Sequence, residues 1–208
     1  SFYEYLIDTY KRYGYHRNLL RSTIMQGAAG TAAIARIQQA LRESPPTEVA
    51  GLSRIGINDY WDLGAYGPFL SETDRGSRNF LTFFFEGGLK VSIRPSGTEP
   101  KNKVYIEKCS DPLGAAATDE AFWDARRKID EEVEAFSSVF MKSMLSIIGV
   151  ELPDYCYLIS DLVSLERKRH FAETFLPELE SRAAAFLRSG TTSPGTTTTM
   201  DRPIPTRH

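Results

Sequence analysis

Apolar residues recur at helical spacing in three stretches of the first 150 residues. Residues 2–13 form one such stretch, and Gly14 provides a stop. We expect the apolar face of this helix to belong to a preceding domain, because no partner lies close in sequence; the alternative is that it packs on a segment further along. A second helix follows Gly30 and ends before Pro45, and a third, long helix starts after Thr118 as its N-cap.

Just before the second helix, and again between the second and third helices, the residues follow patterns typical of β-strands, in part with clear alternation of apolar and polar positions. We expect strands at residues 19–25, 51–57, 80–86, 89–93 and 103–107. Gly87 and Gly88 can take the positive φ values of a tight hairpin between two of them. Strands grouped together, with helices before and after, predict an α+β fold in which an antiparallel sheet is flanked by helices and has one face covered.

The chain changes character after residue 150. Pro153 and Pro177 bracket one further predicted helix, and a last short helix ends at Gly190, so we interpret residues 151–188 as additional C-terminal helices. Thr, Ser and Pro dominate residues 189–208. Such a stretch buries too little apolar surface to offset the entropy of ordering, and we predict that it is disordered.

Composition and charge exclude several classes of function. The 25 basic residues nearly cancel the 27 acidic ones, and the net charge of −2 gives no global field for binding nucleic acid or an anionic membrane. The apolar stretch at residues 138–150 is interrupted by Lys142 and is shorter than the roughly 20 residues that a bilayer requires. Cys109 and Cys156 lie outside any CxxC pattern, which favours reduced thiols and a cytoplasmic location.

Residues 94–101, RPSGTEPK, lie between two predicted strands and gather groups that bind phosphate. A guanidinium offers a planar fork, two hydroxyls can donate protons, a glycine permits a turn of inward-pointing N–H groups, and a lysine adds charge. The candidate phosphate-binding residues are Arg94, Ser96, Gly97, Thr98 and Lys101. Because no helix follows at once, we expect no helix dipole at this loop. On composition alone, such a segment is more often only a turn.

The longer string RPSGTEPKNKVYIE at residues 94–107 resembles the phosphate-binding loop in the last domain of the α-D-phosphohexomutase superfamily, the phosphoglucomutases and phosphomannomutases. TYKRYGYHR at 9–17 is similar to the end of that family's third domain, and IQQALRESPPTEVAG at 37–51 to the entry of its fourth. The resemblance covers roughly residues 3–148.

The resemblance implies that residues 1–18 end the third domain and that 19–150 form a C-terminal phosphate-binding domain with a TATA-binding-protein-like fold. It also implies an enzyme of carbohydrate metabolism that interconverts hexose 1-phosphates and 6-phosphates. In this family a phosphoserine phosphorylates the substrate, the bisphosphorylated intermediate reorients, and a phosphate returns to the serine with the help of Mg²⁺. The fourth domain holds the phosphate that is not reacting, a role that the motif carries over to Arg94, Ser96, Gly97 and Thr98. Asn102 departs from the family pattern, where an aliphatic residue is common.

The sequence contains no Thr-Ala-Ser-His-Asn-Pro serine motif, no Asp-Gly-Asp metal motif and no Gly-Glu-x-Ser-Gly-His sugar motif. We therefore assign no catalytic residue and no metal ligand to this chain and predict that it is an inactive piece of an isomerase. Its expected partners are a hexose phosphate and upstream domains of the same enzyme, with neither nucleic acid nor membrane. The alternative is a stand-alone, non-catalytic module that binds a phosphorylated partner through the same loop.

Overall fold

The computed structural model describes residues 1–189 and divides the chain into two compact units, Ser1–Arg169 and His170–His208. The disorder expected for residues 189–208 concerns a segment that, after Ser189, lies outside the described residues. None of the helices within residues 1–189 combines the length and the apolar character needed to cross a membrane.

The first unit is built on a six-stranded antiparallel sheet with the spatial order β1-β6-β5-β4-β3-β2. The strands are β1 (His16–Ile24), β2 (Glu48–Val49), β3 (Leu52–Asp59), β4 (Leu81–Phe85), β5 (Leu89–Pro95) and β6 (Lys101–Cys109). β1 lies beside β6, with His16 opposite Cys109 and Ile24 opposite Lys101. The predicted α+β fold with an antiparallel sheet is confirmed.

The hairpin between β4 and β5 also has the predicted geometry. Gly87 and Gly88 have φ values of 69° and 74°, which side chains other than glycine rarely adopt. They let the chain reverse within the short turn η1 (Glu86–Gly88), so that Phe83 lies opposite Val91 in the two strands.

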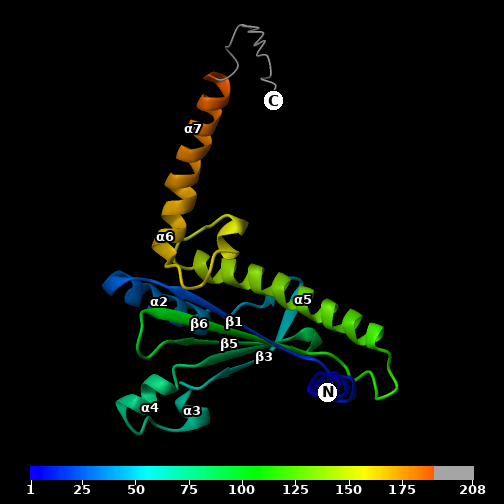
Figure 1. Ribbon diagram of the computed structural model, residues 1–208. Coiled ribbons are helices and arrows are strands. Elements are labelled where there is room, and N and C mark those ends of the chain that lie inside the picture. Colours follow the sequence, from blue (N-terminus) through cyan, green and yellow to red (C-terminus); the bar gives the residue numbers. More distant parts are fainter. Residues whose placement is uncertain (190–208) are drawn as a thin grey trace, which may run out of the picture. The chain divides into compact units, whose positions relative to one another are not determined.

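Two helices, α2 (Gly27–Glu43) and α5 (Asp119–Ser146), cover one face of the sheet (Figure 1). The Thr118 hydroxyl accepts a hydrogen bond from the Ala121 N–H at 3.2 Å, which confirms the predicted N-cap of α5. Apolar side chains of α5 and the sheet form the core: Phe122, Ile129, Val133, Phe136, Phe140, Phe83, Phe85, Val91, Ile93, Val104 and Ile106. The ring of Phe85 meets that of Phe136 edge-on at 5.1 Å between centroids.

The opposite face of the sheet carries mainly polar side chains, because side chains alternate between the two faces along each strand. The connection between β3 and β4 contains two short helices, α3 (Leu63–Tyr66) and α4 (Glu72–Ser77), which lie on this side in Figure 1. Tyr66 of α3 stacks on Tyr60 at 4.8 Å, so the connection is anchored beside the end of β3.

The first helix, α1 (Phe2–Tyr13), packs within this chain, on the start of α5. Buried Lys11 pairs with Asp119 at 2.6 Å, and the ring of Tyr10 stacks on Phe122 at 6.0 Å. Our expectation that the apolar face of this helix lacks a partner here is therefore wrong, because the contact is made with a segment more than 100 residues further along. The assignment of residues 1–18 to a preceding domain stays a prediction.

The segment after α5 contains η2 (Asp154–Tyr157) and α6 (Leu165–His170), with non-helical backbone at residues 158–164. The single helix expected between Pro153 and Pro177 is therefore wrong. In the second unit, the π-helical turn η3 (Phe171–Phe175) leads into α7 (Leu176–Ser189). Pro177 thus lies just after the π-helical turn, and Leu176 before it keeps helical dihedral angles, so the helical path continues through the proline.

Candidate functional site

The candidate loop connects β5 to β6 as a tight turn at residues 95–100. The Ser96 N–H donates to the Lys101 carbonyl at 2.8 Å, and the Lys101 N–H donates to the Glu99 carbonyl at 2.7 Å. These bonds fix both ends of the turn, while Gly97 and Thr98 at its tip are exposed. The sequence motif is therefore presented on a rigid base with its polar groups toward solvent.

The start of α2 lies beside this loop, because β1, which leads into α2, is the sheet neighbour of β6. The Met25 N–H donates to the Pro100 carbonyl at 2.9 Å. Gly30 lets the first turn of α2 pack tightly on the residue that precedes the helix, since a Cβ atom there would lie 2.2 Å from the Met25 carbonyl oxygen. Our expectation that no helix dipole acts at the loop is wrong: the helix comes from a distant part of the sequence rather than from the residues that follow.

A hollow of about 410 Å³ separates the loop from α2. Its lining residues are Gly27, Thr31, Ile34, Pro95, Ser96, Gly97, Thr98, Glu99 and Pro100. Within residues 1–189, neither the Ser96 and Thr98 hydroxyls nor the Gly97 N–H has a hydrogen-bond partner. The first N–H groups of a helix also have no partner within the helix, so unpaired donors from two elements border one hollow.

Arg94 is placed on a different side of the loop. It belongs to the polar face of the sheet and lines a hollow of about 330 Å³ with Tyr60, Tyr105 and Glu107 among its other residues. This placement follows from alternation, since Val91 and Ile93 face the core. Within residues 1–189, the Arg94 guanidinium has no ion pair and no hydrogen bond. The structure thus places Arg94 next to the loop in sequence but in a separate hollow from Ser96, Gly97 and Thr98.

Lys101 is partly occupied by its own loop. Its Nζ lies 2.9 Å from a carboxylate oxygen of Glu99. The hydrogen bond and the charge of Lys101 lower the pKa of the Glu99 carboxyl. Lys101 is therefore the one candidate of the five that already has a charged partner within residues 1–189.

Asn102 supports the loop from the covered face of the sheet. Its side chain is completely buried; Oδ1 accepts from Nε2 of Gln38 on α2 at 3.2 Å, and Nδ2 donates to the sulfur of Met144 on α5 at 3.2 Å. The other amide atom of Gln38, Oε1, is buried without a hydrogen-bond partner within the described part of the chain. Asn102 thus joins both covering helices directly behind the loop, which an aliphatic residue cannot do by hydrogen bonding.

The sequence reasoning missed the α2 residues at this site, Gly27 and Thr31. A usable signal existed in the chain order, since a strand that pairs with β6 and runs directly into a helix must place the helix start at the same end as the β5–β6 loop. The alternation pattern does not show that β1 pairs with β6. The chain order therefore locates the start of α2 only once the order of the strands in the sheet is known.

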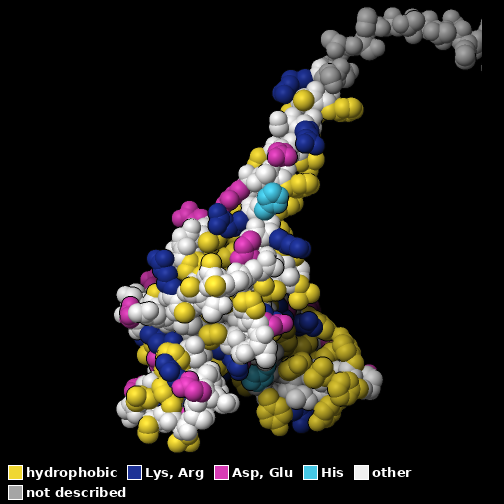
Figure 2. Space-filling view, turned by 90° about the vertical axis from the view of Figure 1, so that its left-hand side faces the viewer, with side chains coloured by type: hydrophobic (Ala, Val, Ile, Leu, Met, Phe, Trp, Pro, Cys, Tyr) yellow, Lys and Arg dark blue, Asp and Glu magenta, His cyan; other side chains and the backbone are white. Residues whose placement is uncertain are grey.

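Charges of both signs are interspersed over the side of the molecule seen in Figure 2. The attraction for an anion is therefore local to the loop rather than spread over a basic surface, as the net charge indicates. Within residues 1–189, no group of three or more His, Cys, Asp or Glu side chains is placed to hold a metal ion.

A family model and individual known proteins that are similar to this chain agree on one family. The model of the phosphoglucomutase/phosphomannomutase C-terminal domain matches residues 19–122. Phosphoglucomutases of Staphylococcus aureus strains MRSA252 and N315 are 35% and 34% identical to this chain over 110 residues, 51% of this chain and 20% of each relative. The chain thus matches about a fifth of the length of these relatives, and the matched domain includes the β5–β6 loop. This chain belongs to the phosphoglucomutase/phosphomannomutase family and contains its C-terminal domain.

Proposed function

We propose that this chain is the carboxy-terminal part of a phosphohexomutase and that its β5–β6 loop binds the phosphate of a hexose phosphate that is not being transferred. The observation that carries the proposal is the hollow between the loop and α2, which unpaired hydroxyl and N–H donors border. Such donors, together with the positive end of a helix, favour an oxyanion.

Each candidate residue has a distinct part in this proposal. The Ser96 and Thr98 hydroxyls and the Gly97 N–H donate to phosphate oxygens from the loop side, and α2 adds its partial positive charge. Arg94 supplies a fork of two N–H donors from the separate hollow on the polar face of the sheet. Within the described residues it forms no ion pair, and the Glu107 carboxylate of the same hollow is paired with Lys90. Lys101 contributes a weaker, longer-range attraction because Glu99 offsets its charge.

We assign the transfer step to domains outside this sequence. The family's phosphoserine loop and metal loop have no counterpart among the 208 residues, and the side chains of residues 1–189 do not fit a bound Mg²⁺. No step through a metal is therefore derived for this chain. The proposed reaction is the interconversion of glucose 1-phosphate and glucose 6-phosphate, with this domain holding the substrate while another domain acts on it.

Binding of glucose 6-phosphate to the 208-residue chain, measured by titration calorimetry, tests the proposal. Arg94→Ala removes a charge-assisted pair and should weaken binding by about ten- to hundredfold, which corresponds to about 1.5–3 kcal/mol. Arg94→Lys should recover only part of the loss, because a point charge cannot replace the fork. Arg36→Ala is the matched control, since Arg36 is an exposed arginine on α2 that lines neither the hollow beside the loop nor the hollow of Arg94.

Glucose without a phosphate provides the second control and should not bind measurably. Equal affinity of Arg94→Ala and Arg36→Ala for glucose 6-phosphate would contradict the role given to Arg94. An activity assay of the 208-residue chain with glucose 1-phosphate, Mg²⁺ and the bisphosphate activator should show no turnover. Turnover above background would show that the transfer machinery is present here after all.

A further inference from the structure

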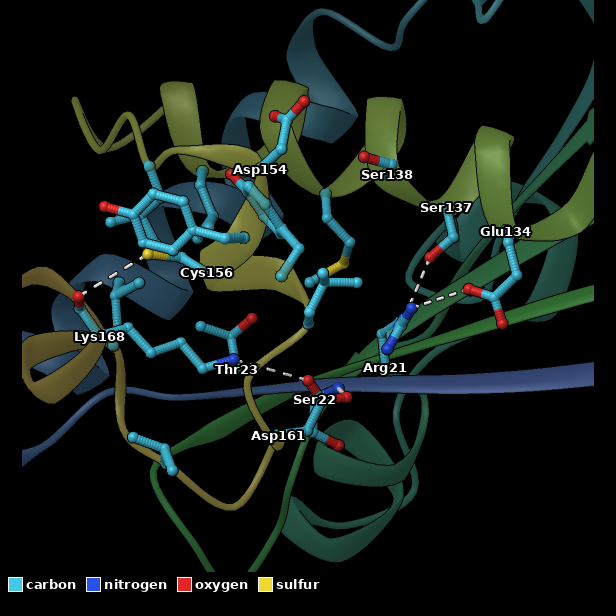
Figure 3. Close-up of a pocket in the computed structure, with 18 residues that line it drawn as sticks. Arg21, Ser22, Thr23, Glu134, Ser137, Ser138, Asp154, Cys156, Asp161 and Lys168 are labelled. Carbon is cyan, nitrogen blue, oxygen red and sulfur yellow. Dashed lines mark hydrogen bonds and ion pairs between the residues drawn. The ribbon is translucent and has the colours of Figure 1, made fainter. Parts of the chain in front are cut away.

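A second cavity, of about 320 Å³, lies on the covered face of the sheet between β1, α5 and residues 150–168 (Figure 3). Its wall is mainly apolar and includes Met141, Leu145, Leu152, Cys156, Val163 and Leu165. Residues 150–168 lie beyond the stretch that matches the family domain. The cavity is therefore a feature of this chain that the family assignment does not explain, and its volume is near the lower limit of small-molecule sites, about 300 Å³.

The charged side chains that line the cavity are already paired. Arg21 Nη2 lies 2.8 Å from a Glu134 oxygen, and its Nε donates to the Ser137 hydroxyl at 3.3 Å. Lys168 Nζ donates to the Ile159 carbonyl at 3.0 Å. These contacts, drawn in part in Figure 3, leave no free charge for an ionic ligand at these two cations.

The two remaining carboxylates of the wall are also satisfied. Asp161 accepts a hydrogen bond from the Ser22 N–H at 2.9 Å and lies 3.8 Å from Lys168 Nζ. Asp154 forms an ion pair with Lys142. A charged ligand would therefore have to break one of these pairs or enter without a partner, and both are costly in an apolar site.

The surroundings of the cavity disfavour charge in the protein itself. Burial lowers the pKa of the Lys168 amine, against the opposing effect of the Asp161 carboxylate. Burial also raises the pKa of the Tyr157 phenol and that of the Cys156 thiol, which keeps both neutral. These directions agree with a low local polarity.

Hydroxyl groups are the polar atoms left open. Thr23 lines the cavity, is only 7% exposed, and has no side-chain hydrogen bond within residues 1–189. Ser138 lines it from α5, likewise without a partner in the described chain. We propose that this cavity binds a neutral small molecule with an apolar body and a single hydroxyl group, which forms a hydrogen bond with Thr23. The apolar body lies against Met141, Leu145 and Leu165.

Fluorescence titration of the 208-residue chain at pH 7 tests the proposal with three probes of one shape: 1-naphthol, 1-methylnaphthalene and 1-naphthoate. We expect 1-naphthol to bind more tightly than 1-naphthoate by about tenfold or more, because the anion finds no partner. Thr23→Val should weaken 1-naphthol binding by about two- to tenfold and leave 1-methylnaphthalene binding unchanged.

A blocking variant locates the site. Ser138→Trp places an indole at the cavity and should abolish binding of 1-naphthol, whereas Val139→Trp, on the next residue of α5 and 41% exposed, should not. Thermal unfolding checks that both variants fold; if Ser138→Trp does not, the Thr23→Val comparison decides.

Four outcomes would overturn the proposal: no saturable binding of 1-naphthol, tighter binding of 1-naphthoate, equal binding by folded Ser138→Trp and Val139→Trp, or unchanged 1-naphthol binding in Thr23→Val. Phosphate binding measured on the same samples reports the loop separately, because none of the loop residues lines this cavity. A failure here therefore leaves the proposed function unaffected, and a failure of phosphate binding leaves this proposal unaffected.

Discussion

The β5–β6 loop and the cavity behind β1 belong to one compact unit but present opposite chemistry. At the loop, hydroxyl and N–H donors and one guanidinium are unpaired within the described residues and lie near solvent. In the cavity, the charged side chains are paired, and the hydroxyls of Thr23 and Ser138 have no hydrogen-bond partner within residues 1–189. The comparison indicates that the state of pairing, more than the number of charged residues, decides which ligand a region can take.

Both regions depend on the same core, and the largest expected effect comes from removing it. Phe136 of α5 is 1% exposed and packs on Phe85. Phe136→Ala should lower the free energy of unfolding by about 3–5 kcal/mol, through lost burial and the cavity left behind. Urea unfolding measures this, with exposed Val139→Ala as the control, expected within about 0.5 kcal/mol of the original chain. If 1-naphthol binding survived in Phe136→Ala after phosphate binding was lost, the two regions would not share one core.

A smaller effect should be confined to the loop. Asn102→Ala removes the partner of the buried Gln38 amide, which costs about 1–3 kcal/mol of stability. Phosphate affinity should fall because the loop loses its link to α2, while 1-naphthol affinity should stay the same. The double variant Asn102→Leu with Gln38→Leu removes both polar partners and should recover part of the stability. No recovery in the double variant would mean that the amide pair is not the reason for the loss.

Features that depend on a few consecutive residues, including the β5–β6 loop, could be predicted from the sequence. The hairpin needs only Gly87 and Gly88 with alternating residues around them, and the candidate phosphate ligands lie within eight consecutive residues. The same holds for the start of α5, where one threonine caps the helix. The functional assignment of the loop residues remains a proposal.

The surroundings of the loop, the cavity and the packing of α1 depend on contacts between distant segments, and the periodicity of the sequence does not reveal these contacts. The start of α2 meets the loop only because β1 pairs with β6, and the cavity gathers Thr23, Met141 and Lys168 from three parts of the chain. The contact of α1 with α5 is another long-range case. Pro177 misled the prediction of the C-terminal helices because a proline usually ends a helix, whereas here a π-helical turn precedes it and the helical path continues.

The pH dependence of stability should distinguish the cavity from the loop. The folded-state pKa of Lys168 is lowered mainly by burial. Between that lowered value and the ordinary lysine pKa, the unfolded chain binds more protons, so this group makes the folded state more stable as pH rises through that window. Lys168→Met should lose this gain, seen as a smaller rise or a steeper fall in the free energy of unfolding from pH 8 to pH 10. Parallel pH profiles of the two proteins would contradict the assignment.

The smallest expected effect concerns Glu166, which lies in the segment that borders the cavity and contacts the start of α2 beside the loop. The Glu166 carboxylate accepts a hydrogen bond from the Gln26 N–H at 3.0 Å, at the start of α2. Its negative charge should repel a phosphate bound between α2 and the loop, but the side chain is exposed and the effect is screened. Glu166→Gln should therefore raise phosphate affinity by no more than about fivefold at low salt. A drop in affinity would show that the carboxylate positions α2 instead of repelling the anion.

Amide chemical shifts of the 208-residue chain, recorded with inorganic phosphate and separately with 1-naphthol, test the contrast between the regions most directly. The account predicts that phosphate moves the amides of Ser96, Gly97 and Thr98 and those at the start of α2, and that added salt weakens this response. It predicts that 1-naphthol moves the amides around Thr23 and Cys156 with little dependence on salt. Phosphate shifts confined to residues after Pro153, or one set of amides that responds to both ligands, would contradict it.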